Sequence, residues 1–287
     1  DAGADVTALG LGGALDYVAG YDGDFTAYTD DFKAPAIDQG KVGSSSGSAS
    51  APLTADDAKA AGLDLLTEER VATALTKSGK GVIVNATDTN RLRSVTLGGG
   101  LGGVVGASLS ANVPVITADT EATIGANARI NRGAGTAGTG QSVLVAAASD
   151  VYDLGVAGSV AGGGLGAGGA GTALAIVDNT TKALVGAGSA LSAKGDIGVT
   201  ARAREDFAEA SAAGSAGGLA SLAGGLSTIA VTDVTMAELA GTAIAQGNVD
   251  VVADDQTRAA LLAGAVSASG GLGLGASIGV LALDKTT

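Results

Sequence analysis

The 287-residue chain contains no cysteine, no histidine and no tryptophan. Without cysteine there is no disulfide framework and no thiolate nucleophile, and without histidine there is no imidazole base. Zinc sites built from these two residue types are excluded for the same reason. Aromatic residues make up only 2% of the chain, so valine, leucine, isoleucine and alanine must form the core. Such side chains fill thin, regular layers better than a thick globular interior.

Positive charge is also scarce, with 16 lysine and arginine residues against 29 aspartate and glutamate residues. The net charge of −13 argues against nucleic acid as a partner, because neutralising phosphate requires clustered basic side chains. An acidic surface suits a soluble extracellular protein. Residues Asp1–Asp5 lack the basic region that opens a signal peptide, so we expect any export signal to lie outside this sequence.

A five-residue strand pattern, Val/Ile-x-Val-x-Ala, organises the chain as a repeat. It occurs four times, at spacings of 61, 54 and 52 residues. The four copies begin at Val82, Val143, Ile197 and Val249. A glycine turn precedes the copies, at Gly79, Gly140, Gly195 and Gly247. The repeat predicts equivalent inward sites, one unit apart, for Val84, Val145, Val199 and Val251.

A glycine-rich, uncharged block follows each copy of this pattern. The blocks cover residues 94–118, 155–177, 210–232 and 259–283. An aspartate closes each block, and a threonine usually follows two residues later. These aspartates are Asp119, Asp178, Asp233 and Asp284. A transmembrane helix would have a similar length, but glycine costs roughly 1 kcal/mol per residue in a helix interior, so no membrane span is expected.

A strand explains the glycine-rich blocks better than a helix. In the last block Leu272, Leu274, Ala276, Ile278 and Val280 share one face, and glycine and serine occupy the other. A glycine face lets another sheet approach closely. Each block is therefore predicted to be a β-hairpin that turns near its central glycines. These turns are expected at Gly98–Gly100, Gly162–Gly164, Gly217–Gly218 and Gly270–Gly271.

A strand, a glycine turn and a second strand, repeated at a fixed period, are typical of a solenoid. In the third copy the residues expected to point inward are Leu191, Ala193, Ile197, Val199, Ala201 and Ala203. Those expected to point outward are Ser192, Lys194, Thr200 and Arg202. The predicted fold is mainly β: a β-solenoid or β-helix-like repeat array with glycine-rich β-hairpins and one short α-helical insert.

The predicted units follow this repeat. Residues 1–33 form a partial N-terminal repeat, 34–80 a Ser/Gly linker and helical insert, and 249–287 a partial C-terminal repeat. Three full repeats lie between, at 81–141, 142–196 and 197–248. In the insert Thr54 is a suitable N-cap with Asp57 three residues later, close to a capping box. We expect helix within Ala55–Lys77, lying against the side of the β body.

Several motifs could carry chemistry. The pattern GxGxxG occurs at Gly98–Gly103 and Gly164–Gly169, but the helix that dinucleotide binding requires is not expected after either copy, so no cofactor is expected. The recurring Asp-x-Thr offers one carboxylate per unit, which favours hydrogen bonds to the local backbone of a turn over calcium binding. The densest acidic cluster supplies the candidate calcium ligands Asp22, Asp24, Asp30 and Asp31. No other metal site is expected.

Paired carboxylates for polysaccharide cleavage are the enzyme hypothesis that a β-helix suggests. The candidates are Glu205, Asp206 and Glu209. Asp254 and Asp255 hold nearly the same place in the next repeat, which favours a solvated edge over a unique catalytic centre. We therefore expect no catalytic residue and a chain that is not an enzyme.

Five of the seven aromatic residues gather in one loop. They are Tyr17, Tyr21, Phe25, Tyr28 and Phe32. Exposed, they would form a contact surface for a binding partner; buried, they would anchor the insert. The sequence leaves both interpretations open and favours anchoring.

The order of strand pattern, glycine-rich block and Asp-x-Thr resembles the giant filamentous adhesins of the leukotoxin-family or filamentous haemagglutinin-like type. The stretch from Asp178 to Ala201, DNTTKALVG and then ALSAKGDIGVTA, is most similar to them. The resemblance omits residues 34–78. It implies secretion, a β-solenoid fold and adhesive or structural work, and it carries over no catalytic residue.

The leading hypothesis is a non-catalytic structural or adhesive segment of a long secreted bacterial filament at the cell surface. The alternatives are a binding module that uses the aromatic loop and the insert, and a self-assembling extracellular matrix fibre subunit. Neither end of the sequence shows a polar capping unit, so we expect both ends to expose strand edges and apolar layers. The expected partners are the chain's own continuation or neighbouring copies at these repeat ends, and host or cell-surface ligands.

Overall fold

The computed structural model describes residues 2–10, 14–18, 80–131 and 137–287. In these ranges every helix or strand element is a strand, which confirms a mainly β fold. No helix in the described part of the chain is long and apolar enough to cross a membrane. The helix predicted within Ala55–Lys77 lies outside the described residues.

The chain winds into stacked, solenoid-like coils, each of which contributes strands to two large sheets and, in the first three coils, a short strand to a third sheet. The first coil holds β3 (Gly81–Gly102), β4 (Val105–Asn112), β5 (Val115–Ile124) and β6 (Arg129–Ile130). The second holds β7 (Ser142–Gly163), β8 (Gly166–Val185) and β9 (Ala190–Ala193). The third holds β10 (Ile197–Gly217), β11 (Ala220–Leu239) and β12 (Thr242–Ala245). The fourth holds β13 (Val249–Ser269) and β14 (Leu272–Thr286).

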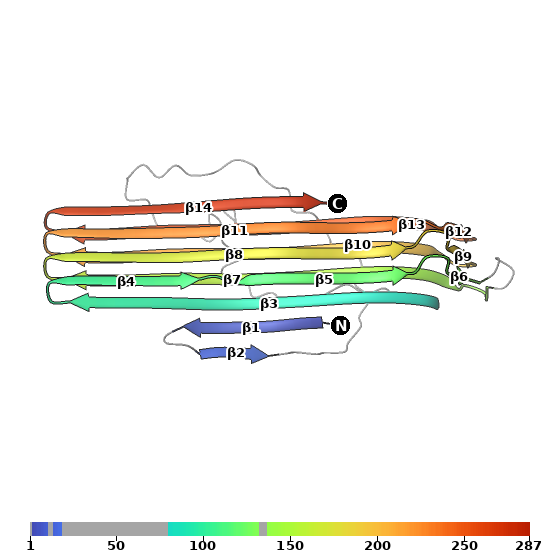
Figure 1. Cartoon of the computed structure of the whole chain (residues 1–287), viewed down its shortest axis with the longest axis horizontal. Coiled ribbons are helices and arrows are strands. Elements are labelled where there is room, and N and C mark those ends of the chain that lie inside the picture. Colours follow the sequence, from blue (N-terminus) through green and yellow to red (C-terminus); the bar gives the residue numbers. More distant parts are fainter. Residues whose placement is uncertain (1, 11–13, 19–79, 132–136) are drawn as a thin grey trace.

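Equivalent strands of successive coils pair in parallel and form three sheets (Figure 1). Sheet A runs in the order β13-β10-β7-β3-β1-β2. Sheet B runs β14-β11-β8-β4, with β5 also paired to β8, and sheet C runs β12-β9-β6. Pro114 separates β4 from β5, because proline has no N–H to give to the ladder.

The N-terminal strands end this stack differently. β1 (Ala2–Gly10) continues sheet A in parallel with β3, with Asp5 opposite Arg91. β2 (Ala14–Val18) then turns back antiparallel to β1, with Leu9 opposite Ala14. The chain therefore does not pass from β1 into sheet B, as it does in the coils that follow.

The register predicted from the repeat is confirmed. Val84, Val145, Val199 and Val251 lie in one ladder of sheet A. Val145 and Val199 are buried and Val84 packs against the same core cluster. Val251 is 45% exposed because β13 is the edge strand of sheet A.

The inward set predicted for the third copy is also confirmed, because all six of its residues are buried. Of the outward set, Lys194 and Arg202 are half-buried, whereas Ser192 and Thr200 are buried. The prediction of solvent exposure is wrong for these two short side chains. Thr200 is flanked by Ala146 and Val252 on the neighbouring strands.

The glycine-rich blocks are not β-hairpins, which corrects the prediction. The two arms of a block belong to different sheets: β7 pairs with β3 and β10, whereas β8 pairs with β4, β5 and β11. The arms therefore face each other through side chains and bond to the coils above and below. Three blocks turn where predicted, but in the first block Gly98–Gly100 lies within β3 and the turn comes at Gly103 and Val104.

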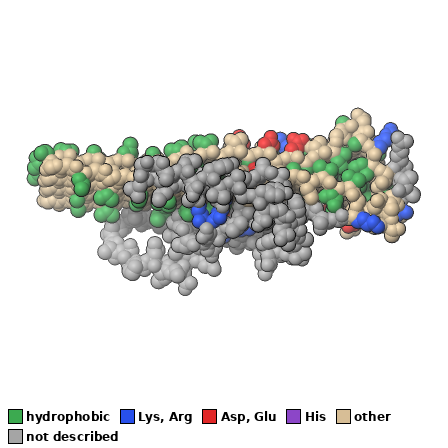
Figure 2. Space-filling model, turned by 90° about the horizontal axis from the view of Figure 1, so that it is seen from below, with side chains coloured by type: hydrophobic (Ala, Val, Ile, Leu, Met, Phe, Trp, Pro, Cys, Tyr) green, Lys and Arg blue, Asp and Glu red, His purple; other side chains and the backbone are tan. Residues whose placement is uncertain are grey.

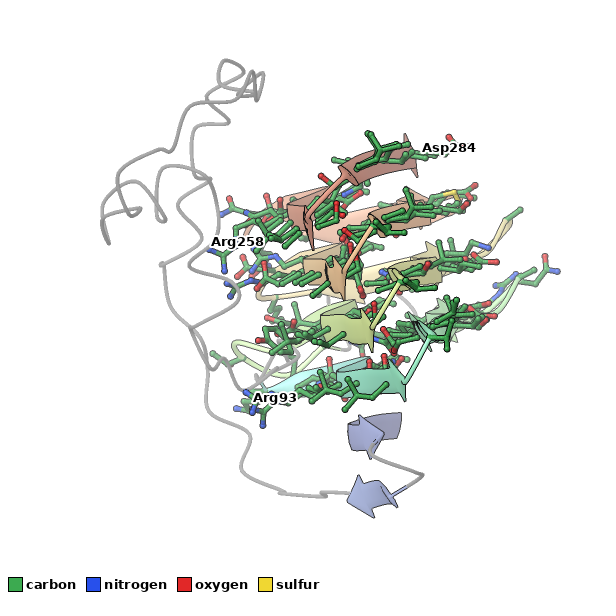
Figure 3. The ribbon with its side chains drawn as sticks, turned by 90° about the vertical axis from the view of Figure 1, so that its left-hand side faces the viewer. Arg93, Arg258 and Asp284 are labelled. Atoms are coloured by element: carbon green, nitrogen blue, oxygen red, sulfur yellow. The ribbon has the colours of Figure 1, made fainter. Side chains whose placement is uncertain are left out.

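The interior changes in thickness along the strands. Valine, leucine and isoleucine fill the end near the short sheet, around Val143, Leu191 and Ile197. Towards the glycine turns, the two long sheets lie face to face with glycine, alanine and serine between them. Figure 3, which views the molecule from the turn end, shows these two stacks of strands side by side.

Inward glycines set the close approach of the two sheets. A Cβ added at Gly225 of β11 would lie 2.6 Å from the carbonyl oxygen of Gly264 in β13. At Gly171 of β8 the corresponding distance, to the carbonyl oxygen of Ala212, is 2.8 Å. No real Cβ tolerates such contacts, so the glycine face predicted for these blocks is the inward face.

Adjacent glycines of β11 provide a matched test of this packing. Gly225→Ala should lower the free energy of unfolding by about 1–3 kcal/mol, because the new methyl group overpacks the interface between the sheets. Gly224→Ala should leave stability unchanged or raise it by about 0.4–1 kcal/mol, because the nearest atom to its Cβ is 3.9 Å away. Urea unfolding of the two variants measures the difference, and equal stabilities would contradict the assignment of faces.

Candidate functional site

Four carboxylates lie inside the coils, between sheets A and B. They are Asp153 of β7, Glu205 and Glu209 of β10, and Asp233 of β11, and each is at most 1% exposed. Each occupies an inward position of its strand, as Val199 does in β10. Burying a carboxylate is costly unless it is paired, so these residues mark the candidate site.

Lys285 of β14 places its ammonium group beside two of these acids and a third carboxylate, Asp255 of β13. Its Nζ lies 3.4 Å from Glu205 Oε2 and 3.6 Å from Asp233 Oδ2, and it donates a hydrogen bond to Asp255 Oδ1. Glu205 and Asp255 belong to sheet A, and Asp233 and Lys285 to sheet B. We refer to Glu205, Asp233, Asp255 and Lys285 as the acid–lysine cluster.

Neutral side chains extend this cluster into neighbouring coils. Thr257 of β13 donates a hydrogen bond of 2.6 Å to Glu205 Oε2. Asn179 of β8 donates one of 2.7 Å to Glu205 Oε1, and Asn179 Oδ1 accepts one of 3.0 Å from Ser149 of β7. The network therefore links the second, third and fourth coils through side chains alone.

The position of sheet B that supplies Asp233 and Lys285 carries a different side chain in each coil. Asn179, Asp233 and Lys285 stack directly on one another in successive coils, and Ala118 holds the same place in the first coil. A column of identical acids would repel itself, whereas an acid between an amide and an ammonium group does not. The sequence difference between coils is therefore what allows charge inside this column.

Burial dominates the proton affinities in the cluster. Desolvation raises the pKa of Asp233 to about 9, and the nearby carboxylates of Glu205 and Asp255 add to the rise. Desolvation also raises the pKa of Glu205, against the opposing attraction of Lys285. Burial favours the neutral amine of Lys285, but Glu205 and Asp255 outweigh it and raise the pKa of Lys285. At neutral pH we therefore expect Lys285 charged and Asp233 protonated.

The acid–lysine cluster also has the spacing of a cation site. One carboxylate oxygen each from Glu205, Asp233 and Asp255 lie within 4.8 Å of one another. Oxygen ligands of Ca²⁺ at 2.3–2.6 Å span such distances. The Lys285 ammonium already supplies positive charge at this point, so a metal ion would have to displace it.

Asp153 and Glu209 form a second buried group. They lie on adjacent coils, and none of their four carboxylate oxygens has a hydrogen-bond donor in the described part of the chain. Gly155 provides the space, because a Cβ there would lie 2.2 Å from Glu209 Oε2 and 2.6 Å from Asn112 Nδ2. Desolvation raises the pKa of Asp153 to about 7 and, together with repulsion from Asp153, the pKa of Glu209 to about 10. We infer that the two carboxyl groups share a proton at neutral pH.

The structure separates the three candidate catalytic carboxylates. Glu205 and Glu209 point inward to different groups, whereas Asp206 points outward and accepts two hydrogen bonds from Arg258, of 2.8 and 3.2 Å. The expectation of a solvated edge is wrong, because all three are at most 1% exposed. Side chains of β10 alternate between the two faces of sheet A. Glu205 and Glu209 lie on the same, inward face as Val199, and Asp206 lies on the opposite face.

The recurring aspartates are not equivalent turn residues, which corrects the sequence interpretation. Asp119, Asp178, Asp233 and Asp284 all lie within strands of sheet B. Asp178 and Asp284 both align with Thr232 and are exposed, whereas Asp233 sits one residue further along and points inward. A shift of one residue moves a strand side chain to the opposite face of the sheet.

Other candidates lie outside the part of the chain that supports a description of side chains. Asp22, Asp24, Asp30 and Asp31 are outside the described residues, as are Tyr21, Phe25, Tyr28 and Phe32. Tyr17 lies in β2, paired with Val6. Strands, not helices, follow both GxGxxG copies, which does not match the dinucleotide-binding context.

Sequence reasoning missed Asp153, Asp233, Asp255 and Lys285 as members of buried groups. The alternation of the sequence could have shown their burial. Each of these residues lies an even number of positions from apolar residues of its own strand and so on the same face, as Asp255 does relative to Val251. Comparison of the chain with protein-family models, curated proteins and solved structures finds no significant match.

The Asp153–Glu209 pair should make stability depend on pH. Both groups bind protons more tightly in the folded chain, with pKa values raised from 3.8 to about 7 and from 4.5 to about 10. The folded state therefore holds more protons than the unfolded state across this window, and stability falls as pH rises through it. Glu209→Gln should flatten the fall, because the amide needs no proton and can donate to Asp153. Urea unfolding at pH 5, 7 and 9 measures both slopes; parallel slopes for the two proteins would contradict the shared proton.

Removing the ammonium group should destabilise the acid–lysine cluster. Breaking a buried ion pair costs about 3–5 kcal/mol, and we expect about 2 kcal/mol for Lys285→Met because the lysine is partly exposed. Adding Asp233→Asn should recover little of this loss at neutral pH, because Asp233 is already protonated there and an amide, like Asn179 in the second coil, carries no charge either. Lys182→Met, on the outer face of β8, is the matched control and should change the free energy of unfolding little.

Proposed function

We propose that this chain is a non-catalytic structural segment of a long secreted bacterial surface filament, a stalk that extends or displays an adhesive part. The observation that carries the proposal is the in-register stacking of equivalent coils. From β3 to β14 every coil adds one parallel strand to sheet A and one to sheet B, except that the first coil adds the two shorter strands β4 and β5 to sheet B. Such an array grows along one axis and yields a stiff rod, which is the mechanical property that a stalk requires.

The chemistry of the buried groups supports a structural role. The acid–lysine cluster joins the third and fourth coils through Lys285, which lies beside Glu205, Asp233 and Asp255. Hydrogen bonds to Glu205 from Thr257 and Asn179 extend it to the second coil. Each group therefore acts as a cross-link between coils. A catalytic pair of carboxylates would instead need to face a substrate, and Glu205 and Glu209 are both fully buried.

The resemblance of the repeat unit to filamentous adhesins supports the secreted, cell-surface part of the proposal. The absence of cysteine from the chain and its net charge of −13 are compatible with that setting. Host or cell-surface ligands would then be bound by the displayed part of the filament.

The edge of the stack supplies a means of extension. Interior side chains of the fourth coil stay half exposed, with Val251 at 45% and Leu281 and Leu283 at 46%. Their counterparts in the second and third coils, such as Val199 and Ile229, are fully buried. A further coil, from the same chain or from another copy, would bury these side chains and pair the free edges of β13 and β14.

End-to-end association of separate copies tests this edge. Wild-type protein should show a mass that rises with concentration in light scattering. Val251→Asp should abolish open-ended growth of the mass, because its carboxylate would be buried under the next coil. Val252→Asp should not, because Val252 points outward with similar exposure, 41%. A wild-type monomer at every concentration, with no end-to-end contacts in electron micrographs, would contradict an edge open to stacking.

A further inference from the structure

The outer face of sheet B carries large apolar side chains over the glycine-rich half of the molecule. Two each from β4, β11 and β14 are exposed: Val105, Leu109, Leu222, Leu226, Leu274 and Ile278. We name this surface the apolar face. Figure 2 shows hydrophobic side chains at this end of the molecule, with the charged side chains lying further along.

Charge is excluded from the whole region. Residues 105–116, 166–177, 220–231 and 272–283, which form this half of sheet B, contain no Asp, Glu, Lys or Arg. The first charged side chains beyond it on this face include Asp178 and Asp284. Covering the apolar face therefore desolvates no ionised group. Monomeric proteins rarely expose continuous apolar patches of more than a few hundred Å² unless these bind something.

The shape of the apolar face is self-complementary, so that the same face of two copies can fit together. β8 presents three small residues on this face: Val105 and Leu109 of β4 lie beside Gly166 and Ala170, and Leu222 of β11 lies beside Gly168. The face thus has a shallow groove over these residues of β8 beside a ridge at Leu222, whereas Leu226 lies beside Thr172. A two-fold axis parallel to the strands, midway between β8 and β11, sets the ridge of each copy into the groove of the other.

The size of the apolar face matches the needs of a dimer. About twelve residues at ~3.3 Å per residue and four strands ~4.8 Å apart give roughly 40 by 19 Å, or about 760 Å². A stable protein interface buries about 800 Å² on each partner. Flat sheets with apolar side chains pack face to face in this way inside β-sandwiches.

We propose that two copies of this chain pair face to face through their apolar faces. The pairing goes beyond the stalk function and does not depend on it, because it uses side chains of sheet B and leaves the strand edges free. A second copy fits better than an anionic lipid surface, since the uncharged stretches of sheet B offer no lysine or arginine to meet headgroups. Lateral pairing would thicken a filament, whereas edge stacking would lengthen it.

The experiment separates the two kinds of association by using Val251→Asp as the parent protein, in which edge stacking is blocked. Sedimentation equilibrium of this parent should give twice the chain mass of 26.9 kDa. Adding Leu222→Asp, at a position 59% exposed on the apolar face, should return the mass to that of one chain. The matched control is Val160→Asp, 65% exposed on the outer face of sheet A, which should remain a dimer.

Cross-linking gives a second measurement that does not depend on charge. The chain has no native cysteine, so Leu222→Cys and Val160→Cys each introduce a single thiol. A short bis-maleimide should join two copies through residue 222 and not through residue 160. Unchanged far-ultraviolet circular dichroism will show that each variant is folded.

Three results would overturn the proposal. The first is a monomeric parent at concentrations far above those of the assay. The second is a dimer that survives Leu222→Asp or that Val160→Asp disrupts. The third is a monomer that co-sediments with phosphatidylcholine vesicles and loses this binding on Leu222→Asp, which would assign the face to lipid. None of these results depends on whether the wild-type protein stacks at its edges. The stalk proposal and the face-to-face pairing can therefore be contradicted independently.

Discussion

In-register stacking of coils is the constraint on which the rest of this structure depends. Each long strand bonds to its equivalent in the coils above and below, so every side chain lies directly against the residue at the same position of its neighbours. A residue at one position must therefore fit against the residues at the same position of the neighbouring coils. Val145 and Val199 do so by packing against each other inside the core.

The same constraint governs the buried charges. Two carboxylates at one register position would be forced together by the ladder, and the sequence avoids this arrangement in the columns that hold its buried acids. Asp233 stacks between Asn179 and Lys285, Asp153 on Phe207, and Glu205 between Val151 and Thr257. The remaining close pair, Asp153 and Glu209, is diagonal, and a shared proton removes its repulsion. Variation between repeats is thus a requirement of stacking wherever a charge is buried.

In the glycine-rich half of the molecule, small residues lie inside and large apolar residues lie outside, the reverse of the usual arrangement. Where the two long sheets approach until a Cβ at Gly225 would meet a carbonyl oxygen at 2.6 Å, only glycine, alanine and serine fit between them. Leucine and isoleucine on the same strands must then point outward, as Leu222 and Ile278 do. The apolar outer surface is therefore a direct consequence of the thin interior.

Much of the fold could be predicted from the sequence, because period and alternation are local properties. The repeat fixed the register of Val84, Val145, Val199 and Val251, and alternation assigned the inward residues of the third copy from Leu191 to Ala203. The sequence also predicted two strands and a turn in each glycine-rich block, although the two strands do not pair with each other.

Only the tertiary structure decided what the arms of each block bond to and which carboxylates meet. A hairpin and a pair of strands in opposite sheets show the same alternation of inward and outward residues. They differ in the rotation of each strand about its own axis, which decides whether its backbone bonds to the other arm or to a neighbouring coil. Asp233 and Asp178 look equivalent in the sequence, yet a shift of one residue places one inside and the other outside. Glu205, Asp233, Asp255 and Lys285 are up to 80 residues apart in the chain, and they meet because stacked coils bring distant strands together.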